Sequence, residues 1–204
     1  MTQDSLPEFV RLTGVILILD VVESVRLMEV DESGYIQRWQ RFVREIREEV
    51  LPEFSGRIHK STGDGLLIEF RTPAQAVQAA FGLLRTCAAI NAELRQDDHM
   101  RLRIAAHVAQ FVVDEYDIYG CGINLAHRLL QLATPGEVCI SATFRSLLDE
   151  NTPARVVDCG MHQLRHVREP VRVYKVQPAG SDAGPGGPLL QAGATSAPAA
   201  CVAA

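Results

Sequence analysis

The sequence lacks the features that mark secreted, membrane-spanning or nucleic-acid-binding proteins. Its 204 residues carry a formal net charge of -5, so no basic excess favours a nucleic acid as the main ligand. The longest apolar run, 15–22, is interrupted by Asp20 and is far too short to cross a bilayer. Residues 1–5 include an acidic side chain and no apolar signal segment. We therefore expect a cytoplasmic protein with no nucleic-acid partner and no membrane insertion.

Cysteine and histidine are present but form no ligand pattern. The five cysteines are scattered and contain no Cys-x-x-Cys spacing. An odd number of dispersed cysteines is typical of a reducing compartment, where thiols pack as small apolar side chains. The six histidines form no cluster with zinc-ligand spacing. We expect free thiols and no zinc site.

The composition predicts one domain with short flanking segments. We expect a leader over 1–11, a single folded domain over 12–177, and a tail over 178–204. The tail is rich in Ala, Gly, Pro and Ser and has one charged residue, Asp182. Such a segment cannot bury enough apolar surface to offset its ordering entropy, so we expect it to be disordered. A linker of this kind would allow a regulatory domain or protein to follow it.

Strand and helix patterns alternate through the domain. A helical region capped by Ser24 and interrupted at 31–34 is expected to end at Pro52. Thr72 and Ser141 are expected to cap two later helices, and a further helix is expected over 123–132. The expected strands are 14–22, 57–61, 66–70, 102–108, 138–140, 155–157 and 171–176. The order predicts an α+β fold, a βαββαβ core with an α/β extension, in which helices pack on a mixed or antiparallel sheet.

Two carboxylates occupy positions that are suited to a metal. Asp20 closes a run of aliphatic residues, where a charged group is costly unless it is solvated, paired or metal-bound. Asp64 lies between Gly63 and Gly65 in a predicted hairpin turn, where glycines allow phosphates to approach the backbone. Paired carboxylates make a hard oxygen site for Mg²⁺ bound together with substrate phosphates. The alternative is that Asp64 is only the turn residue of the hairpin.

Lys60 and Asp117 match the hydrogen-bonding edge of adenine. Adenine presents an acceptor beside a donor amino group, and guanine presents the reverse. Lysine can only donate and a carboxylate can only accept, so the pair fits adenine and mismatches guanine. Taken singly, Lys60 could be an exposed strand lysine and Asp117 a turn or cap residue.

Asn124 and Arg128 are four residues apart on a predicted helix and share one face. An amide can hold a ribose, and a guanidinium on the same face can reach phosphates with forked geometry. The alternative is an ordinary solvated helix face.

These segments together resemble the class III nucleotidyl cyclase catalytic domain. The resemblance covers about 12–177 and is carried by 14–29, 60–70, 103–108, 117–129 and 135–141. It implies a ferredoxin-like palm core. By the resemblance, Asp20, Asp64 and the Val21 backbone carbonyl would hold two Mg²⁺ or Mn²⁺ ions.

The resemblance also implies how the other residues would act. Lys60 and Asp117 would select adenine, Gly63 would contact the substrate, Asn124 would position the ribose, and Arg128 would stabilise the transition state. The domain would work as a homodimer with two shared interface sites. One subunit would supply the metal carboxylates and its partner the other side chains, so Lys60 and Asp64 would serve opposite sites.

The chain departs from the family pattern at several positions. A lysine that touches phosphate in the family corresponds here to Arg165, which keeps the charge and would act in catalysis with changed geometry. Glu23 replaces a glycine in the loop after Asp20 and brings negative charge close to the expected phosphate position. The remaining departures are Ala105, Ala109, Cys121 and His127.

The resulting expectation is an adenylate cyclase that converts ATP to 3′,5′-cyclic AMP and pyrophosphate by two-metal in-line attack. A guanylate cyclase would need a carboxylate in place of Lys60 and a small polar residue in place of Asp117. A second alternative, motivated by Glu23 and Arg165, is a catalytically weak or inactive module that binds nucleotide or dimerises to regulate a partner.

Overall fold

The computed structural model describes residues 10–114 and 117–179. The helical elements are α1 (Ser24–Glu45), η1 (Ile46–Val50), α2 (Leu51–Glu53), α3 (Pro73–Asn91), η2 (Gln96–Asp98), α4 (Cys121–Leu130) and α5 (Ala142–Leu147). The strands are β1 (Arg11–Val21), β2 (Arg57–Ser61), β3 (Gly65–Phe70), β4 (Leu102–Val113), β5 (Ile118–Tyr119), β6 (Val138–Ser141), β7 (Ala154–His162) and β8 (Val171–Pro178). This confirms the predicted α+β fold and the βαββαβ order of its first half.

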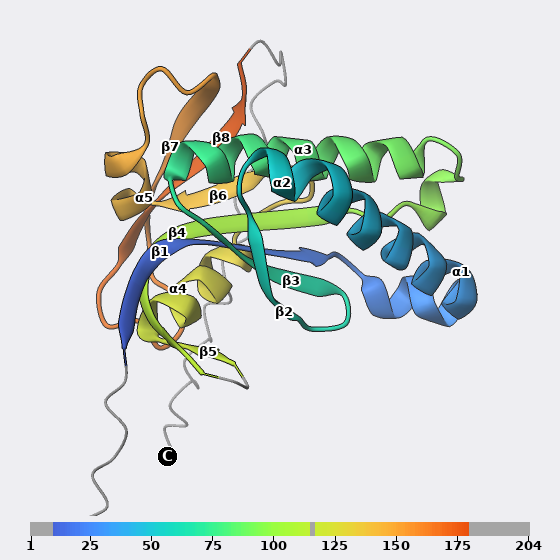
Figure 1. The fold of residues 1–204 in the computed structure, drawn as a ribbon, viewed down its shortest axis with the longest axis horizontal. Helices are drawn as coiled ribbons and strands as arrows, with labels where there is room; N and C mark the ends of the chain where they lie inside the picture. The colour runs from blue at the N-terminus through green and yellow to red at the C-terminus, as the bar shows by residue number, and fades with distance from the viewer. Residues whose placement is uncertain (1–9, 115–116, 180–204) are drawn as a thin grey trace, which may run out of the picture.

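The described strands form one mixed sheet in the order β2-β3-β1-β4-β6-β8-β7, with β5 paired to β4 (Figure 1). The central strand β1 is antiparallel to both β3 and β4. The β4–β6 pair is parallel, whereas β8 is antiparallel to both β6 and β7. The central strand β1 supplies residues to the cores on both faces of the sheet, as is typical of a continuous apolar strand.

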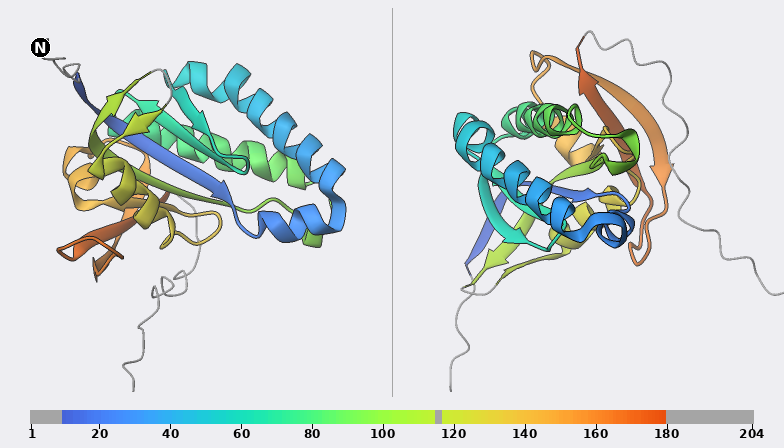
Figure 2. Two further views of the ribbon diagram at one scale, coloured as in Figure 1. Left: turned by 90° about the horizontal axis from the view of Figure 1, so that it is seen from below. Right: turned by 90° about the vertical axis from the view of Figure 1, so that its right-hand side faces the viewer.

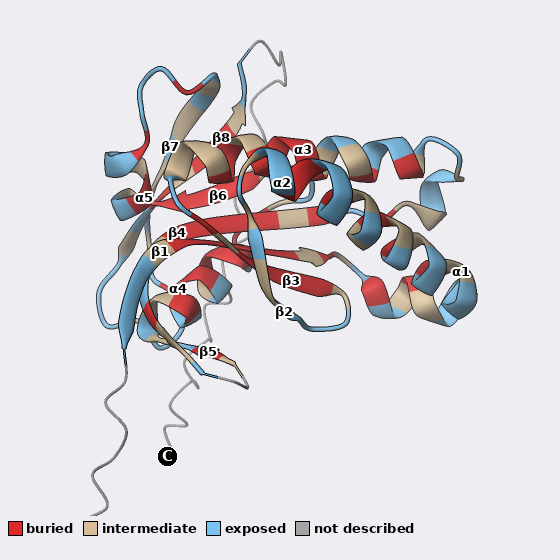
Figure 3. Ribbon diagram, in the orientation of Figure 1, coloured by how far each residue is buried: buried red, intermediate tan, exposed pale blue. Residues whose placement is uncertain are grey.

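Each face of the sheet has its own hydrophobic core. Alternate residues of β1 divide between them: Leu17 and Leu19 belong to one core, and Ile16 and Ile18 to the other. The first core packs against α1, α3 and α5, and the second packs against α4. Figure 2 shows α1 and α3 on one side of the sheet and α4 on the other, and Figure 3 shows buried residues concentrated in the central strands.

The helix boundaries follow local sequence signals. Thr72 caps α3, because its hydroxyl accepts from the Gln75 N–H at 3.2 Å, and Ser141 caps α5 in the same way through Phe144. Helix α1 is kinked at Asp31, within the predicted interruption. Pro52 does not end the helical region as expected. It lies in α2, which continues directly from η1, and the helical region ends one residue later, at Glu53.

Several sequence expectations change in extent. Strand β7 is longer than the expected 155–157, and β5 was not predicted. The leader lies outside the described residues except for 10 and 11. The tail does so except for Pro178, which ends β8, and Ala179. Among the described residues, no helix has both the length and the apolar character needed to cross a membrane.

Lys175 is a buried cation that ties β8 to the turn before β6. The residue is 6% exposed, and its Nζ lies 2.6 Å from a carboxylate oxygen of Glu137. Arg172 lies on the same strand, and both side chains of its ion pair with Asp158 are exposed to solvent. Strand β8 therefore carries one buried and one exposed ion pair, whose contributions to stability can be compared.

We expect Lys175→Met to lower the free energy of unfolding by about 3–5 kcal/mol, because Glu137 would remain buried without its partner. Arg172→Met, the matched control, should cost less than about 1 kcal/mol. A Lys175→Met/Glu137→Leu double variant should recover most of the loss. Urea unfolding of the three variants measures these values, and equal losses for the two single variants would contradict the prediction.

Candidate active site

Strand pairing brings Asp20 and Asp64 together. Asp20 lies near the end of β1 and is paired in register with Gly65, the first residue of β3. The Val21 N–H donates to the backbone carbonyl of Asp64 at 3.1 Å, which ties the β2–β3 turn to the end of β1. The two predicted metal carboxylates are therefore neighbours in the fold, although 43 residues lie between them in the chain.

The turn that carries Asp64 needs both of its glycines. Gly63 has φ of 91°, in the left-handed region that favours glycine. A Cβ on Gly65 would lie 2.9 Å from the Leu19 carbonyl oxygen and 2.8 Å from the Thr62 hydroxyl. The Thr62 N–H donates to the Gly65 carbonyl at 2.9 Å and closes the turn. The glycines thus have a structural reason to be present, and the substrate contact assigned to Gly63 stays a prediction.

Each carboxylate has a side-chain partner in the metal-free chain. The Arg103 guanidinium donates to both oxygens of Asp20, at 2.6 and 2.8 Å, and this hydrogen bonding is the main cause of its raised pKa. The Ser24 hydroxyl donates to the Asp64 carboxylate. The expectation that Ser24 caps α1 is therefore wrong: Glu23 is at the cap position, without a side-chain cap, and the Ser24 hydroxyl is used by Asp64.

Glu23, a departure from the family pattern, is held by two arginines. Its backbone has φ of 57°, in the left-handed region where a glycine would be unstrained. Its carboxylate lies 3.0 Å from the Arg101 guanidinium and 3.4 Å from that of Arg26. The additional negative charge is therefore balanced locally by these two cations.

Lys60 and Asp117 are paired at one end of a pocket of about 450 Å³. The Lys60 ammonium donates to the Asp117 carboxylate and is the main cause of that group's lowered pKa. The other oxygen of Asp117 accepts from the Ile118 N–H at 2.8 Å, which orients the carboxylate. The pocket lining is mixed: Ile18, Leu67 and Ile123 supply apolar walls, and Asn124 and His127 add polar groups.

A register shift in β2 determines which face Lys60 occupies. Ile58 pairs with Ile68, but Lys60 pairs with Leu67, so His59 is the extra residue of a β-bulge. Leu67 belongs to the core on the α4 face. Without the bulge, alternation would place Lys60 opposite Leu66, whose side chain lies in the core beneath α1 and α3. The bulge thus turns Lys60 toward Asp117.

Helix α4 places Asn124 and Arg128 beside a second pocket, of about 560 Å³. Gly122 allows this approach, because a Cβ there would lie 2.6 Å from that of Ala109. Asn124 lines both pockets, whereas Arg128 lines only the second, together with Arg165 and Arg168. Three arginines make this pocket suited to an anion.

His107 is the buried histidine of this second pocket. Its Nδ1 lies 2.7 Å from the Ser141 hydroxyl, and burial lowers its pKa to about 4, so the ring is neutral at pH 7. The charge of the pocket therefore comes from its arginines. Arg165, the predicted substitute for a family lysine, donates through Nε to the His166 ring at 3.0 Å.

The donor set fits a divalent ion bound together with its substrate. The described residues contain no group of three or more His, Cys, Asp or Glu side chains that could hold a metal ion. Two adjacent carboxylates are nevertheless the usual protein contribution to an Mg²⁺ site in which phosphates supply further oxygens. The role of the Val21 carbonyl stays a prediction.

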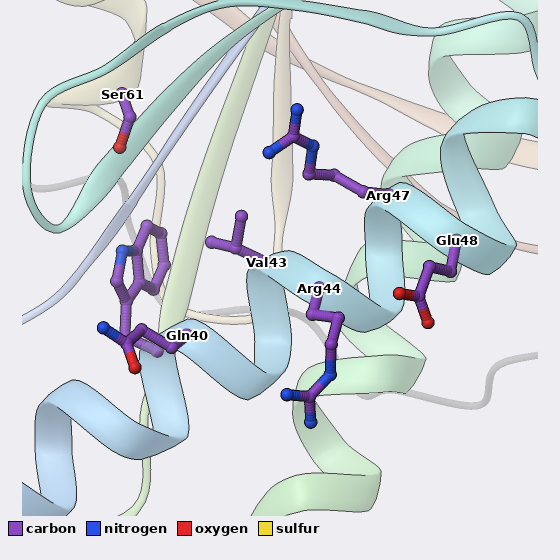
Figure 4. A pocket seen from close by; sticks show the side chains of 7 residues that line it. Gln40, Val43, Arg44, Arg47, Glu48 and Ser61 are labelled. Atoms are coloured by element: carbon purple, nitrogen blue, oxygen red, sulfur yellow. The ribbon is translucent and has the colours of Figure 1, made fainter.

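A third pocket, of about 480 Å³, lies between α1 and β2 and is separate from the predicted site (Figure 4). Its lining includes Val43 and Arg44 of α1, Arg47 of η1 and Ser61 of β2. Ser61 pairs with Leu66 and so lies on the opposite face of β2 from Lys60. None of the predicted site residues lines this pocket.

Arg103 is the site residue that the sequence did not reveal as such. It lies in a stretch that carries the family resemblance, but its contact with Asp20 depends on the register of β1 against β4, in which these two residues are paired. No local pattern specifies that register. The contact of Ser24 with Asp64 was missed for the same reason.

No family model matches the chain. A curated relative, putative adenylate cyclase 3 of Rhizobium meliloti (strain 1021), is 34% identical over 172 residues. The match covers 82% of this chain and 29% of that protein, so the chain spans less than a third of this relative's length.

Solved structures share the fold. A crystal structure of an adenylate/guanylate cyclase/hydrolase from Silicibacter pomeroyi is 26% identical, covers 82% of this chain and 98% of that chain, and has a TM-score of 0.72. The adenylyl cyclase CyaB from P. aeruginosa is 20% identical, with coverage of 87% and 100% and a TM-score of 0.77, which shows the fold alone. The likeness in sequence together with the shared fold makes this chain a member of the class III adenylate/guanylate cyclase catalytic domain family.

Proposed function

We propose that the chain is an adenylate cyclase domain that converts ATP to 3′,5′-cyclic AMP and pyrophosphate. The observation that carries the proposal is the Lys60–Asp117 pair in the lining of a pocket that also has apolar walls. A donor beside an oriented acceptor complements the adenine edge and leaves guanine with two mismatched polar groups. The Rhizobium relative, putative adenylate cyclase 3, supports the same base.

The remaining residues would position the ribose and the phosphates. Asn124 lines both pockets, so it lies where a nucleoside in the first would continue into a triphosphate in the second. Arg128 and Arg165 would neutralise charge that develops as the ribose 3′-oxygen bonds to the α-phosphorus and pyrophosphate leaves. No side chain among these is required as a dedicated general base, because such transfers depend chiefly on position and charge.

Asp20, Asp64 and the Val21 carbonyl would hold the two divalent ions. When bound, such ions lower the pKa of the attacking hydroxyl and neutralise the leaving group. Arg103 donates to both oxygens of Asp20, so its positive charge opposes the binding of a cation at this carboxylate. We therefore expect ions to bind far more tightly together with the nucleotide than alone, since the phosphates give the guanidinium a new partner.

A homodimer with two shared sites is part of the proposal. Within the described residues of one chain, neither Asp20 nor Asp64 lines the pocket of Lys60 and Asp117 or the pocket of Arg128. This separation is expected if each site combines the carboxylates of one subunit with the base pocket of its partner.

The Asp20–Arg103 ion pair also favours a second candidate, a nucleotide-binding module without turnover. Both oxygens of one predicted metal ligand are satisfied by the protein itself. Such a module would bind ATP through Lys60 and Asp117 but release no pyrophosphate.

Turnover of ATP and GTP by the purified chain, first with Mn²⁺ and then with Mg²⁺, distinguishes the two candidates. We expect cyclic AMP from ATP, little cyclic GMP, and loss of at least about 100-fold in activity for Asp64→Ala, as removal of a metal ligand predicts. Chromatography of the cyclic products is the measurement. ATP binding without cyclic product, at concentrations where the chain is dimeric, would instead identify the binding module.

Mixing two inactive variants tests the shared site. Asp20→Ala and Lys60→Ala should each be nearly inactive, whereas an equimolar mixture should recover activity because one site of each heterodimer is intact. The mixture of Asp20→Ala with Asp64→Ala is the matched control and should stay inactive, since both changes lie on the same half of the site. Mixed dimers without recovery would exclude the shared-site arrangement.

Exchange of the base-reading pair tests the choice of adenine. Lys60→Glu with Asp117→Cys removes the donor and acceptor that fit adenine and introduces an acceptor for guanine, so the ATP/GTP ratio of kcat/KM should fall by at least about tenfold. Competitive assays with both nucleotides measure the ratio. An unchanged ratio would show that other residues select the base.

A further inference from the structure

Tyr35 is a buried tyrosine whose hydroxyl group has no hydrogen-bond partner in the described part of the chain. The residue is 1% exposed, on the inner face of α1, and its hydroxyl is among the unpartnered buried side-chain atoms. Buried tyrosine hydroxyls are nearly always hydrogen-bonded, because an unsatisfied polar group in a core costs folding free energy. The position therefore calls for a partner that the metal-free chain does not supply.

The kink in α1 sets the position of Tyr35. Asp31 departs from helical geometry, with φ of -154° and ψ of 82°, and its carboxylate accepts from the Gly34 N–H at 2.9 Å. The carboxylate thus caps a second helical segment, whose first turn carries Tyr35. The start of α1 lies beside the β2–β3 turn, where Ser24 bonds Asp64 (Figure 1). Tyr35 lies on the same helix as Ser24, beyond the kink at Asp31.

The charges around the Tyr35 hydroxyl are those of the candidate metal site. Burial is the main cause that raises the pKa of Tyr35 to about 12, and the negative charge of Asp64 is the next. Asp20 acts in the same direction and Arg38 opposes them. The phenol is consequently protonated at all physiological pH values, so it can donate a hydrogen bond but is not a base.

Asp64 has one side-chain donor at present, the Ser24 hydroxyl. Carboxylates that ligate metals are usually held by further hydrogen-bond donors, which orient them and tune their affinity. We propose that Tyr35 is a positioning residue for Asp64, whose phenol donates to the Asp64 carboxylate when that carboxylate holds a divalent ion. The inference rests on the proposed metal-dependent function and adds a residue that the family pattern did not indicate.

This role predicts opposite effects of one substitution on stability and on metal binding. Tyr35→Phe removes an unpartnered hydroxyl, so the metal-free protein should keep its Tm or gain a few degrees. The same variant should bind Mn²⁺ about tenfold more weakly in the presence of 3′-deoxy-ATP, which cannot cyclise. Thermal unfolding and calorimetric titration with Mn²⁺ measure the two quantities. Tyr174→Phe, the same change on β8, is the control and should alter neither.

The outcomes separate this inference from the proposed function. If the wild-type chain binds no Mn²⁺ with the nucleotide analogue, the metal-dependent function fails and the role of Tyr35 fails with it. If Asp64→Asn abolishes binding but Tyr35→Phe binds as the wild type does, only the role of Tyr35 is excluded. A fall in Tm of about 3 °C or more for Tyr35→Phe without metal would show that the hydroxyl has a structural partner, and would also overturn the inference.

Discussion

The antiparallel pairing of β1 with both β3 and β4 is the constraint on which the candidate site depends. This strand has buried apolar side chains on both faces over most of its length, so its own pattern does not fix its register, which depends on packing against both neighbours. That register puts Asp20 opposite Gly65 on one side and Arg103 on the other. A slip by one residue would turn Asp20 to the opposite face of the sheet.

The polar groups of the site are balanced in the absence of ligand. Arg103 satisfies Asp20, Ser24 satisfies Asp64, Lys60 satisfies Asp117, and two arginines satisfy Glu23. Such pairing limits the cost of bringing several charges together at low exposure. Ligand binding must therefore replace these contacts with new ones. The affinity then depends on the hydrogen bonds and ion pairs that the phosphates and the base form with the released side chains.

Two pockets, one lined by the Lys60–Asp117 pair and one lined by three arginines, meet at Asn124. In the proposed function, adenosine triphosphate would divide between them, with its base beside the pair and its phosphates beside the arginines. Helix α4 determines this geometry. Gly122 allows the helix to lie close to Ala109 of β4, and this places the Asn124 amide between the two pockets. The departures Cys121 and His127 lie on this helix and line the second and first pockets respectively, where they leave the predicted ribose and phosphate residues in place.

The sequence alone determined the succession of elements and the choice of candidate site residues. Periodicity, caps such as Thr72 and the glycines around Asp64 are local signals, and they were sufficient for the α+β fold and for selecting Lys60, Asp64 and Asp117 as candidates. The tertiary structure decided which of these groups meet. The bulge at His59 that turns Lys60, the Arg103 contact with Asp20 and the use of Ser24 by Asp64 all depend on strand register and helix placement. Those arise from packing between segments distant in the chain, which no short sequence pattern encodes.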